Sequence, residues 1–356
     1  MRIALIWSLF IAALCTTLHA TDTKEIVKVG VILPLSGDNS DFGKPIQELL
    51  NYKFSHLPKN SHLEYKLFFE DDQLVAKNAL LAAHRLIDLE NVDVLITMFS
   101  ASGSVVAPLA AQKKVPQLML NMNEAAADGH FNFICITPVD ESAKLWHKYA
   151  TEKGYRKVAF FIHRNTGGEM VLKALQKTKE GSEIDWVACE RFNPGEIDFR
   201  VALMKLKETH PDALFLFGFN PEQPIIVHQL KQMGWDIPIC SIGNTEMDMK
   251  DPLFEDIWFA GVNAPTIKFI KWYEENLHKS YPPWGATYSC ISDLIYKSFE
   301  DGWNGKKPTH EQVSKNLLGV KDFDSDCGRI SCDTKGIFRT TPVLMVVKHG
   351  SIEPIK

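Results

Sequence analysis

The fold is decided by the stretch Val94-Leu-Ile-Thr-Met-Phe-Ser-Ala-Ser-Gly-Ser-Val-Val-Ala-Pro-Leu-Ala-Ala-Gln-Lys-Lys-Val-Pro-Gln-Leu-Met-Leu-Asn-Met-Asn123. Its first part, 94–99, is a continuous apolar run, which predicts a strand buried on both faces. Small and hydroxylated residues follow at 100–104, then an alanine-rich segment with helical spacing at 105–113, and then a second short apolar run that ends at two asparagines. The stretch therefore predicts a strand–turn–helix–strand unit.

In such a unit, the loops that follow the two strands lie at the same edge of a parallel sheet, where open α/β sheets bind ligands. A helix that starts near Gly103 would also point its free N–H groups and its positive dipole end toward that edge. We therefore expect Ser100 and Ser102 to lie where an anion such as a carboxylate could be held. A second interpretation, compatible with the first, is that one of the two serines only caps the helix.

The first twenty residues have the pattern of a signal peptide. Arg2 gives a positive start, 3–14 form an apolar core too short to span a membrane, and 18–20 end in a small residue. This pattern predicts an exported, periplasmic protein with a signal peptide at about 1–20.

Length and composition narrow the class of protein. The chain has 356 residues, of which 45% are hydrophobic and 23% charged, and its net charge is −5. Without a signal peptide it is still longer than one hydrophobic core usually supports, so two domains are expected. Lysine and arginine are scattered and do not form the basic, aromatic-interleaved stripes that favour nucleic-acid binding, so we expect no nucleic-acid partner.

The sequence lacks the common catalytic and metal-binding motifs. The segment 100–104 lacks the first glycine of GxSxG, no HExxH occurs, and no phosphate-binding loop precedes Gly305. The twelve histidines show no ligand spacing and the cysteines no CxxC pair, so neither an enzyme nor a metal or cofactor is expected. In an exported protein, Cys327 and Cys332, which flank a glycine-containing turn, could form a disulfide.

Strand and helix signals alternate in two successive series, the first from residue 26 to 136 and the second from 142 to 242. Three helical stretches at 266–279, 286–302 and 309–317 and a β-rich tail at 328–348 continue neither series. These later segments indicate a chain that crosses several times between two lobes, and hence a hinge.

Short motifs run through the chain in a fixed order: Val29-Gly-Val-Ile-Leu-Pro-Leu-Ser-Gly37 with Phe42-Gly43, Glu70-Asp71-Asp72, Ala83-His-Arg-Leu-Ile87, Val92-Asp93, Ala107-Pro108-Leu109-Ala110, Val115-Pro116, Ala286 to Tyr296, and Gly336-Ile-Phe338 with Gly350. Each is weak alone. In this order and at these spacings they resemble the type I solute-binding proteins of ABC importers, of the branched-chain amino acid (Leu/Ile/Val) binding kind, over nearly the whole chain after the signal peptide.

The resemblance implies an α/β fold of two flavodoxin-like lobes with parallel sheets, joined by a hinge of three crossovers, that closes like a flytrap. The implied lobes are 21–139 plus 263–320 and 140–262 plus 321–356. By position, Ser100 would hold a ligand carboxylate and Phe42 would be an aromatic lid. The full implied ligand-binding set is Phe42, Ser100, Ala101, Ser102, Asn121, Asn123, Gly167, Phe219 and Asn244.

Departures from the family pattern concern the ligand. Relatives often have tyrosine where this chain has Gly167, and amino-acid binders frequently place an acid where it has Asn244. These departures leave open whether the ligand carries an ammonium group, which would need a buried acceptor. The implied function is to capture a small polar solute, an amino acid or an amide-like compound, and to hand it to an ABC permease in the inner membrane. The protein is expected to be a monomer. The alternative is an exported ligand-sensing or protein-binding module of the same fold that is not coupled to transport.

Overall fold

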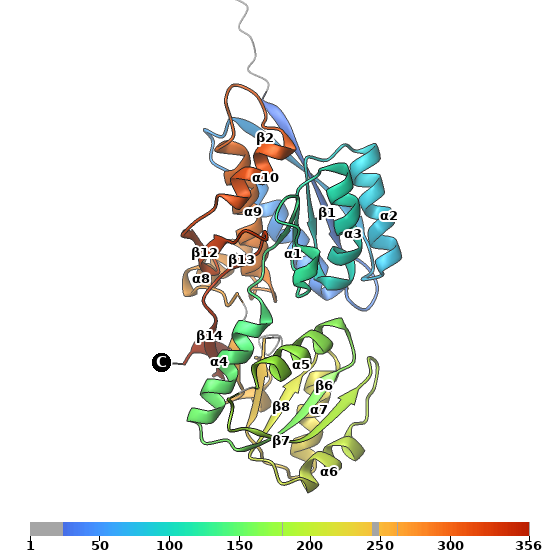
Figure 1. The fold of residues 1–356 in the computed structure, drawn as a ribbon, viewed down its shortest axis with the longest axis vertical. Helices are drawn as coiled ribbons and strands as arrows, with labels where there is room; N and C mark the ends of the chain where they lie inside the picture. The colour runs from blue at the N-terminus through green and yellow to red at the C-terminus, as the bar shows by residue number, and fades with distance from the viewer. Residues whose placement is uncertain (1–23, 180, 244–248, 262, 356) are drawn as a thin grey trace, which may run out of the picture.

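The computed structural model describes residues 24–179, 181–243, 249–261 and 263–355. It consists of two α/β lobes stacked along the long axis of the molecule (Figure 1). The expected signal peptide lies outside the described residues. Within those residues, no helix is long and apolar enough to cross a membrane.

The first lobe is built on a parallel sheet with the strand order β2-β1-β3-β4-β5. This order is that of flavodoxin-like sheets. Its middle strands are buried on both faces, which explains the continuous apolar runs that predicted them. The strands are β1 Glu25–Leu33, β2 Leu63–Asp71, β3 Val94–Thr97, β4 Gln117–Met119 and β5 Asn132–Ile134.

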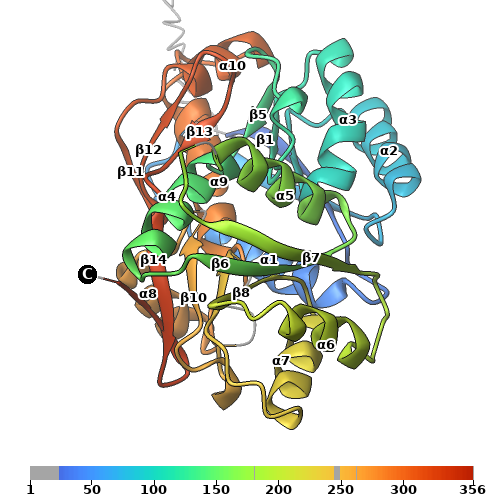
Figure 2. The same ribbon diagram turned by 60° about the horizontal axis from the view of Figure 1, so that its bottom comes forward.

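Helices cover both faces of this sheet, and three of them come from late in the chain (Figures 1 and 2). The late helix α9 packs on α1, and α10 packs on α9. The helices are α1 Ser40–Ser55, α2 Ala76–His84 with a π-helical turn Arg85–Leu89, α3 Phe99–Lys113, a short 3-10 turn Glu124–Ala126, α8 Ile267–Leu277, α9 Gly285–Glu300 and α10 His310–Leu318.

The second lobe carries a seven-stranded sheet in the order β15-β14-β10-β9-β8-β6-β7. The five strands from β6 to β10 are parallel, and the two C-terminal strands add an antiparallel edge. Its strands are β6 Lys157–His163, β7 Asp185–Phe192, β8 Ala213–Phe217, β9 Ile239–Ile242, β10 Trp258–Gly261, β14 Val343–Lys348 and β15 Ser351–Pro354; its helices are α4 Val139–Glu152, α5 Thr166–Thr178, α6 Arg200–Glu208, α7 Glu222–Gln232 and the 3-10 turn Pro252–Phe254.

A small antiparallel sheet lies beside the first lobe. It consists of β11 Phe323–Ser325, β12 Gly328–Cys332 and β13 Phe338–Arg339. Ile337 bridges Ile134 of β5, so this sheet contacts the edge of the first lobe, although the sequence-based division assigned it to the second. The division of the chain into lobes stays a prediction.

The chain passes between the lobes three times, as the resemblance implied. The passages lie between β5 and α4 (135–138), between β10 and α8 (of which 263–266 are described) and between β13 and β14 (340–342). The expected fold of two lobes with parallel sheets and a three-crossover hinge is confirmed.

Helix α1 begins at Ser40, and its proline, Pro45, does not mark its start. Backbone bonds from Ser40 N–H to the Gly37 carbonyl and from Phe42 N–H to the Asn39 carbonyl, both 3.1 Å, start the helix earlier, so Pro45 lies inside it.

Candidate ligand site

The segment after β3 is a helix from its first residue, and not the polar turn that the sequence predicted. Phe99 has a φ of +64°, which turns the chain sharply, and α3 begins there, so that residues 100–104 form its first turns. The N-cap is Met98, and no side chain caps the helix. The capping interpretation of Ser100 and Ser102 is therefore wrong, because both lie inside the helix and not before it.

Ser100 lies at the edge where the two predicted loops meet. Its Oγ accepts a hydrogen bond of 3.0 Å from the backbone N–H of Met122, which belongs to the loop after β4. The first turn of α3 is thus joined directly to the loop after β4, although 22 residues separate the two partners. Because the hydroxyl accepts this bond, its hydrogen is available to donate to a ligand oxygen beside the N-terminus of α3.

Ser102 and Ala101 are placed differently from Ser100. Ser102 is fully buried, and its hydroxyl donates to the carboxylate of Asp72 at the end of β2. The second oxygen of that carboxylate accepts from Leu74 N–H at 2.9 Å. Burial raises the pKa of Asp72, and the bond from Ser102 opposes this shift. Through this bond, Ser102 fixes the start of α3 to the end of β2. Ala101, on the same turn of the helix, is half-buried.

The neighbouring aspartate holds the loop after β1. Asp71 Oδ1 accepts from the backbone N–H groups of Leu35, at 2.8 Å, and of Ser36, at 3.3 Å, and Oδ2 accepts from the Ser36 hydroxyl at 2.5 Å. Burial acts to raise the pKa of Asp71, but these hydrogen bonds outweigh it and the pKa is lowered. Consecutive aspartates thus fix two separate segments of the ligand-facing edge. The sequence signal for this role was the acidic ending of β2, which was read only as a family motif.

The two asparagines shape the loop after β4. Asn121 is buried, its amide group donates to Ser104 Oγ at 3.0 Å, and its Oδ1 accepts from Asn123 N–H at 2.8 Å. Asn123 Oδ1 accepts from Ala125 N–H at 3.2 Å and caps a short 3-10 turn. The side-chain oxygens of both asparagines are therefore used inside the loop. The ligand role of Asn121 and Asn123 stays a prediction.

Phe42 lies inside α1 and packs against the first residue of α3. Its side chain is only 9% exposed, and its ring meets that of Phe99 edge-on, with the ring centroids 5.5 Å apart. Phe42 thus packs behind the turn that opens α3, and its role as an aromatic lid stays a prediction.

In the second lobe, two of the predicted ligand residues, Gly167 and Phe219, lie next to each other. A Cβ atom added at Gly167 would lie 3.7 Å from the ring of Phe219. The ring of Phe219 also meets His163, at the end of β6, with centroids 5.6 Å apart. Burial lowers the pKa of His163, so this wall carries a neutral imidazole at pH 7. No pattern in the sequence singles out His163 among the twelve histidines.

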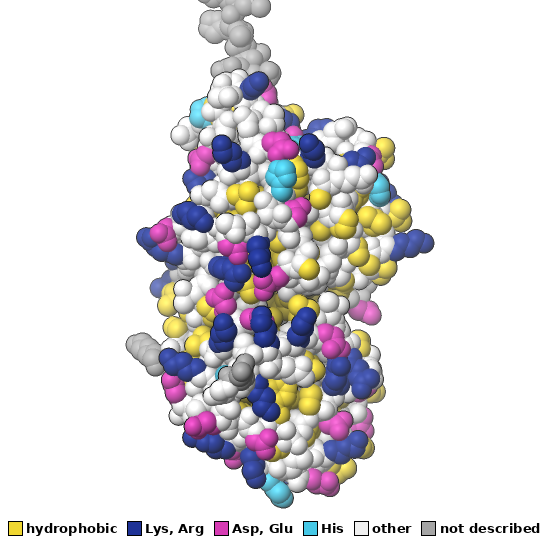
Figure 3. Space-filling model, viewed as in Figure 1, with side chains coloured by type: hydrophobic (Ala, Val, Ile, Leu, Met, Phe, Trp, Pro, Cys, Tyr) yellow, Lys and Arg dark blue, Asp and Glu magenta, His cyan; other side chains and the backbone are white. Residues whose placement is uncertain are grey.

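The two lobes are in contact at the boundary between them. Helix α3 of the first lobe and helix α5 of the second lie next to each other there. Apolar side chains and lysine or arginine side chains meet at this boundary on the face shown in Figure 3. Asn244, the remaining predicted contact, lies outside the described residues.

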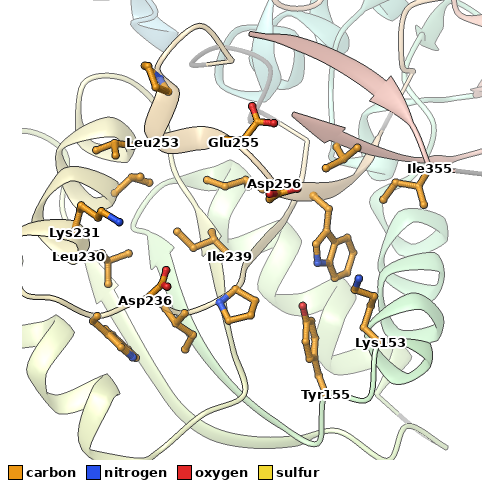
Figure 4. A pocket seen from close by; sticks show the side chains of 18 of the residues that line it. Lys153, Tyr155, Leu230, Lys231, Asp236, Ile239, Leu253, Glu255, Asp256 and Ile355 are labelled. Atoms are coloured by element: carbon orange, nitrogen blue, oxygen red, sulfur yellow. The ribbon is translucent and has the colours of Figure 1, made fainter. Parts of the chain in front are cut away.

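A separate cavity of about 760 Å³ lies at the opposite edge of the second sheet (Figure 4). It opens where β9 and β10 begin, with Tyr155 and Lys153 on one side and Leu230 and Lys231 on the other. None of the predicted ligand residues lines it. Because ligands of open α/β sheets bind at the carboxyl ends of the strands, we place the candidate site at the other edge.

Cys327 and Cys332 do not form the expected disulfide. All six cysteines among the described residues are free. Cys327 precedes β12 and Cys332 ends it, so an extended strand separates them. An extended strand rises about 3.3 Å per residue, so five residues separate the two Cα atoms by about 16 Å. A disulfide can bridge Cα atoms only up to roughly 7 Å apart.

Comparisons with known proteins point to one family. A sequence model described as "periplasmic binding protein" matches residues 26–342. The leucine-, isoleucine-, valine-, threonine-, and alanine-binding protein of Pseudomonas aeruginosa is 28% identical over 202 residues, which are 53% of this chain and 52% of that protein. The chain thus aligns with about half the length of this curated relative.

Solved structures share the fold at low sequence identity. The branched-chain amino acid transporter substrate-binding protein LivJ of Streptococcus pneumoniae, in complex with isoleucine, has a TM-score of 0.82 at 19% identity, covering 93% of this chain and 99% of that one. A solute-binding protein of an ABC transporter from Rhodopseudomonas palustris, in complex with benzoate, has a TM-score of 0.83 at 17% identity, covering 93% and 95%. These likenesses establish the type I periplasmic binding protein fold.

Proposed function

Since the chain belongs to the periplasmic binding protein family, a family of solute-binding proteins, we propose that it captures a small carboxylate-bearing solute between its two lobes and delivers it to an ABC permease. An exported, periplasmic location and a monomeric state are part of this proposal. The observation that carries it is the hydrogen bond from Met122 N–H to Ser100 Oγ, which leaves a hydroxyl donor beside the N-terminus of α3.

The chemistry of the two walls supports the ligand class. The first wall offers the Ser100 hydroxyl and the positive end of a helix dipole, which suit a carboxylate. The second wall offers Phe219 and a neutral His163, which suit an apolar body. Isoleucine and benzoate, which two fold relatives hold, both combine a carboxylate with an apolar body. We therefore propose such a compound, with an amino acid as the first candidate.

The ammonium group of an amino acid would need an acceptor of its own. Asp72 is fully buried and bonded to Ser102, and Asp71 is engaged by the loop after β1. A panel of matched pairs, each an acid with and without its α-amino group, therefore tests whether the site accepts an ammonium group.

The test is calorimetric titration and thermal unfolding with this panel. A true ligand raises the melting temperature by mass action. Ser100→Ala should weaken the ligand by about 1.5–3 kcal/mol, the usual value of a hydrogen bond to a charged group, which is roughly 10- to 150-fold in Kd. Ser55→Ala removes an exposed hydroxyl at the end of α1 and is the matched control, which should leave Kd unchanged.

Two results would contradict the proposal. The first is an affinity of the Ser100→Ala protein within a factor of about two of the wild type, since one hydrogen bond to a carboxylate is worth more than that. The second is the absence of a thermal shift across the panel, which would favour the protein-binding alternative. Uptake of the identified ligand by cells with and without this protein then separates transport from sensing.

A further inference from the structure

Each of the three crossovers contributes one buried polar side chain at the hinge. Thr137 lies between β5 and α4, Asn263 between β10 and α8, and Thr340 between β13 and β14. Their exposed fractions are 1%, 8% and 6%. A buried polar group must be hydrogen-bonded, or its desolvation costs free energy. The three side chains satisfy that demand with one another.

The bonds form one closed cluster, which we call the hinge knot: Thr137, Asn263 and Thr340. Asn263 Oδ1 accepts from the backbone N–H of Thr137 and from its hydroxyl, both at 2.9 Å. The Thr137 hydroxyl oxygen accepts from Thr340 N–H at 2.8 Å and lies 2.7 Å from the Thr340 hydroxyl. Residues 126 and 203 positions apart in the sequence are joined in this way.

Asn263 is the centre of the knot. Its amide group donates to the carbonyl of Cys135 at 2.7 Å, which fixes the orientation of the side chain, so that Oδ1 faces Thr137. The backbone of Asn263 is left-handed, with a φ of +56°, a conformation that asparagine adopts more readily than most residues. One side chain on the second crossover therefore bonds to three groups of the first crossover, and its Oδ1 also accepts from the Thr340 hydroxyl at 3.3 Å.

A charged cluster lies next to the knot on the third crossover. The Arg339 guanidinium donates to Asp333 at 2.9 Å, beside the small sheet, and to Glu141 in the first turn of α4 at 2.6 Å. Arg339 is about one-third exposed, so salt screens its ion pairs. The knot is buried and contains no charged group, so added salt should weaken the ion pairs of Arg339 and leave the hydrogen bonds of the knot unchanged.

We propose that Asn263 is a positioning residue that sets the angle between the lobes. The hydrogen bonds of the knot are all satisfied in the arrangement seen here, in which α3 and α5 lie next to each other. A rotation of one lobe that moves the three crossovers relative to one another would leave some of these buried groups without partners, which costs free energy. The knot thus favours the adjacent arrangement before any ligand is bound.

The consequence for binding rests on the proposed function. When only a fraction of the molecules has the lobe arrangement that binds the ligand, the apparent Kd equals the intrinsic Kd divided by that fraction. The side chain of Asn263 bonds to Cys135, Thr137 and Thr340, none of which is a predicted ligand residue, so it would change affinity through the lobe angle alone.

The experiment measures the lobe arrangement without ligand. Spin labels at Gln112→Cys on α3 and Gln176→Cys on α5, both exposed positions, report the distance between the lobes by double electron–electron resonance in a Cys189→Ser background. The knot variants are Asn263→Gly, which suits the left-handed backbone, and Thr137→Val, which keeps the shape and loses the hydroxyl. Ser298→Ala removes an equally buried hydroxyl within α9 and is the control.

We expect Asn263→Gly to raise the fraction of molecules with widely separated labels about tenfold, with a smaller rise for Thr137→Val, at both low and high salt. Ser298→Ala should match the wild type even if its melting temperature falls. A wild-type distance distribution in Asn263→Gly, or in Thr137→Val should the glycine variant not fold, overturns the proposal. Because no ligand is added, a failure of the proposed ligand function does not affect this result.

Discussion

The bond between Ser102 and Asp72 gives the sharpest test of how the ligand-facing edge is held. Both residues are fully buried, and the serine hydroxyl donates to the carboxylate. Ser102→Ala leaves one carboxylate oxygen without that donor while Leu74 N–H still binds the other. Loss of a buried hydrogen bond to a charged group costs about 1.5–3 kcal/mol, so we expect the free energy of unfolding to fall by about 2 kcal/mol at pH 7.

The pH dependence of this loss has a definite sign. Burial raises the pKa of Asp72 in the folded protein, so its contribution to stability is present at low pH and is lost as the pH rises through the folded pKa. When Asp72 is protonated, Ser102 gives up only a bond to a neutral group, worth about 0.5–1.5 kcal/mol. The difference between Ser102→Ala and the wild type should therefore be smaller at acidic pH than at pH 7.

Urea unfolding at pH 7 and at about pH 4, near the ordinary pKa of a carboxyl group, measures both quantities. Ser298→Ala is the matched control: its hydroxyl is as deeply buried but donates to the neutral Ile295 carbonyl, at 2.9 Å, so its effect should not depend on pH. The reasoning is refuted if Ser102→Ala costs less than about 0.5 kcal/mol, or if its cost is the same at both pH values.

Three further predictions concern stability and redox state. Asp71→Asn should destabilise the protein at pH 7 and progressively less below about pH 4, because the lowered pKa of Asp71 gives stability that is lost as the pH falls through the folded pKa; urea unfolding at several pH values checks this. Gly168→Ala should cost about 1–3 kcal/mol by thermal unfolding, since its Cβ would lie 2.0 Å from the His163 carbonyl oxygen, whereas Gly167→Ala, with its nearest atom at 3.5 Å, should fold as the wild type does; equal losses would contradict the packing. Cys327 and Cys332 should both be alkylated after denaturation without reductant, and an intact mass that changes on reduction would show a disulfide instead.

Much of the fold followed from local patterns. The apolar run from Val94 is a buried strand because both faces of a parallel sheet are covered, and this pattern needs no knowledge of distant residues. The helical stretches after residue 265 do not continue the alternation of strand and helix, which predicted that they return to a lobe already formed. In the structure, α9 packs on α1 of the first lobe and α10 packs on α9. The start of α3 was misplaced because a positive φ at Phe99 permits a sharper turn than its residue type suggests.

Only the tertiary structure assigned roles within the site. The sequence by itself predicted that the loops after β3 and β4 lie at one edge of a sheet, since strands joined through a helix run parallel. The order of the strands came from the structure. It did not distinguish Ser100, which faces the loop after β4, from Ser102, which binds Asp72, because two residues of one helix differ by which distant groups they meet. The knot around Asn263 was invisible for the same reason: hydrogen bonds between side chains more than a hundred residues apart leave no local pattern in the sequence.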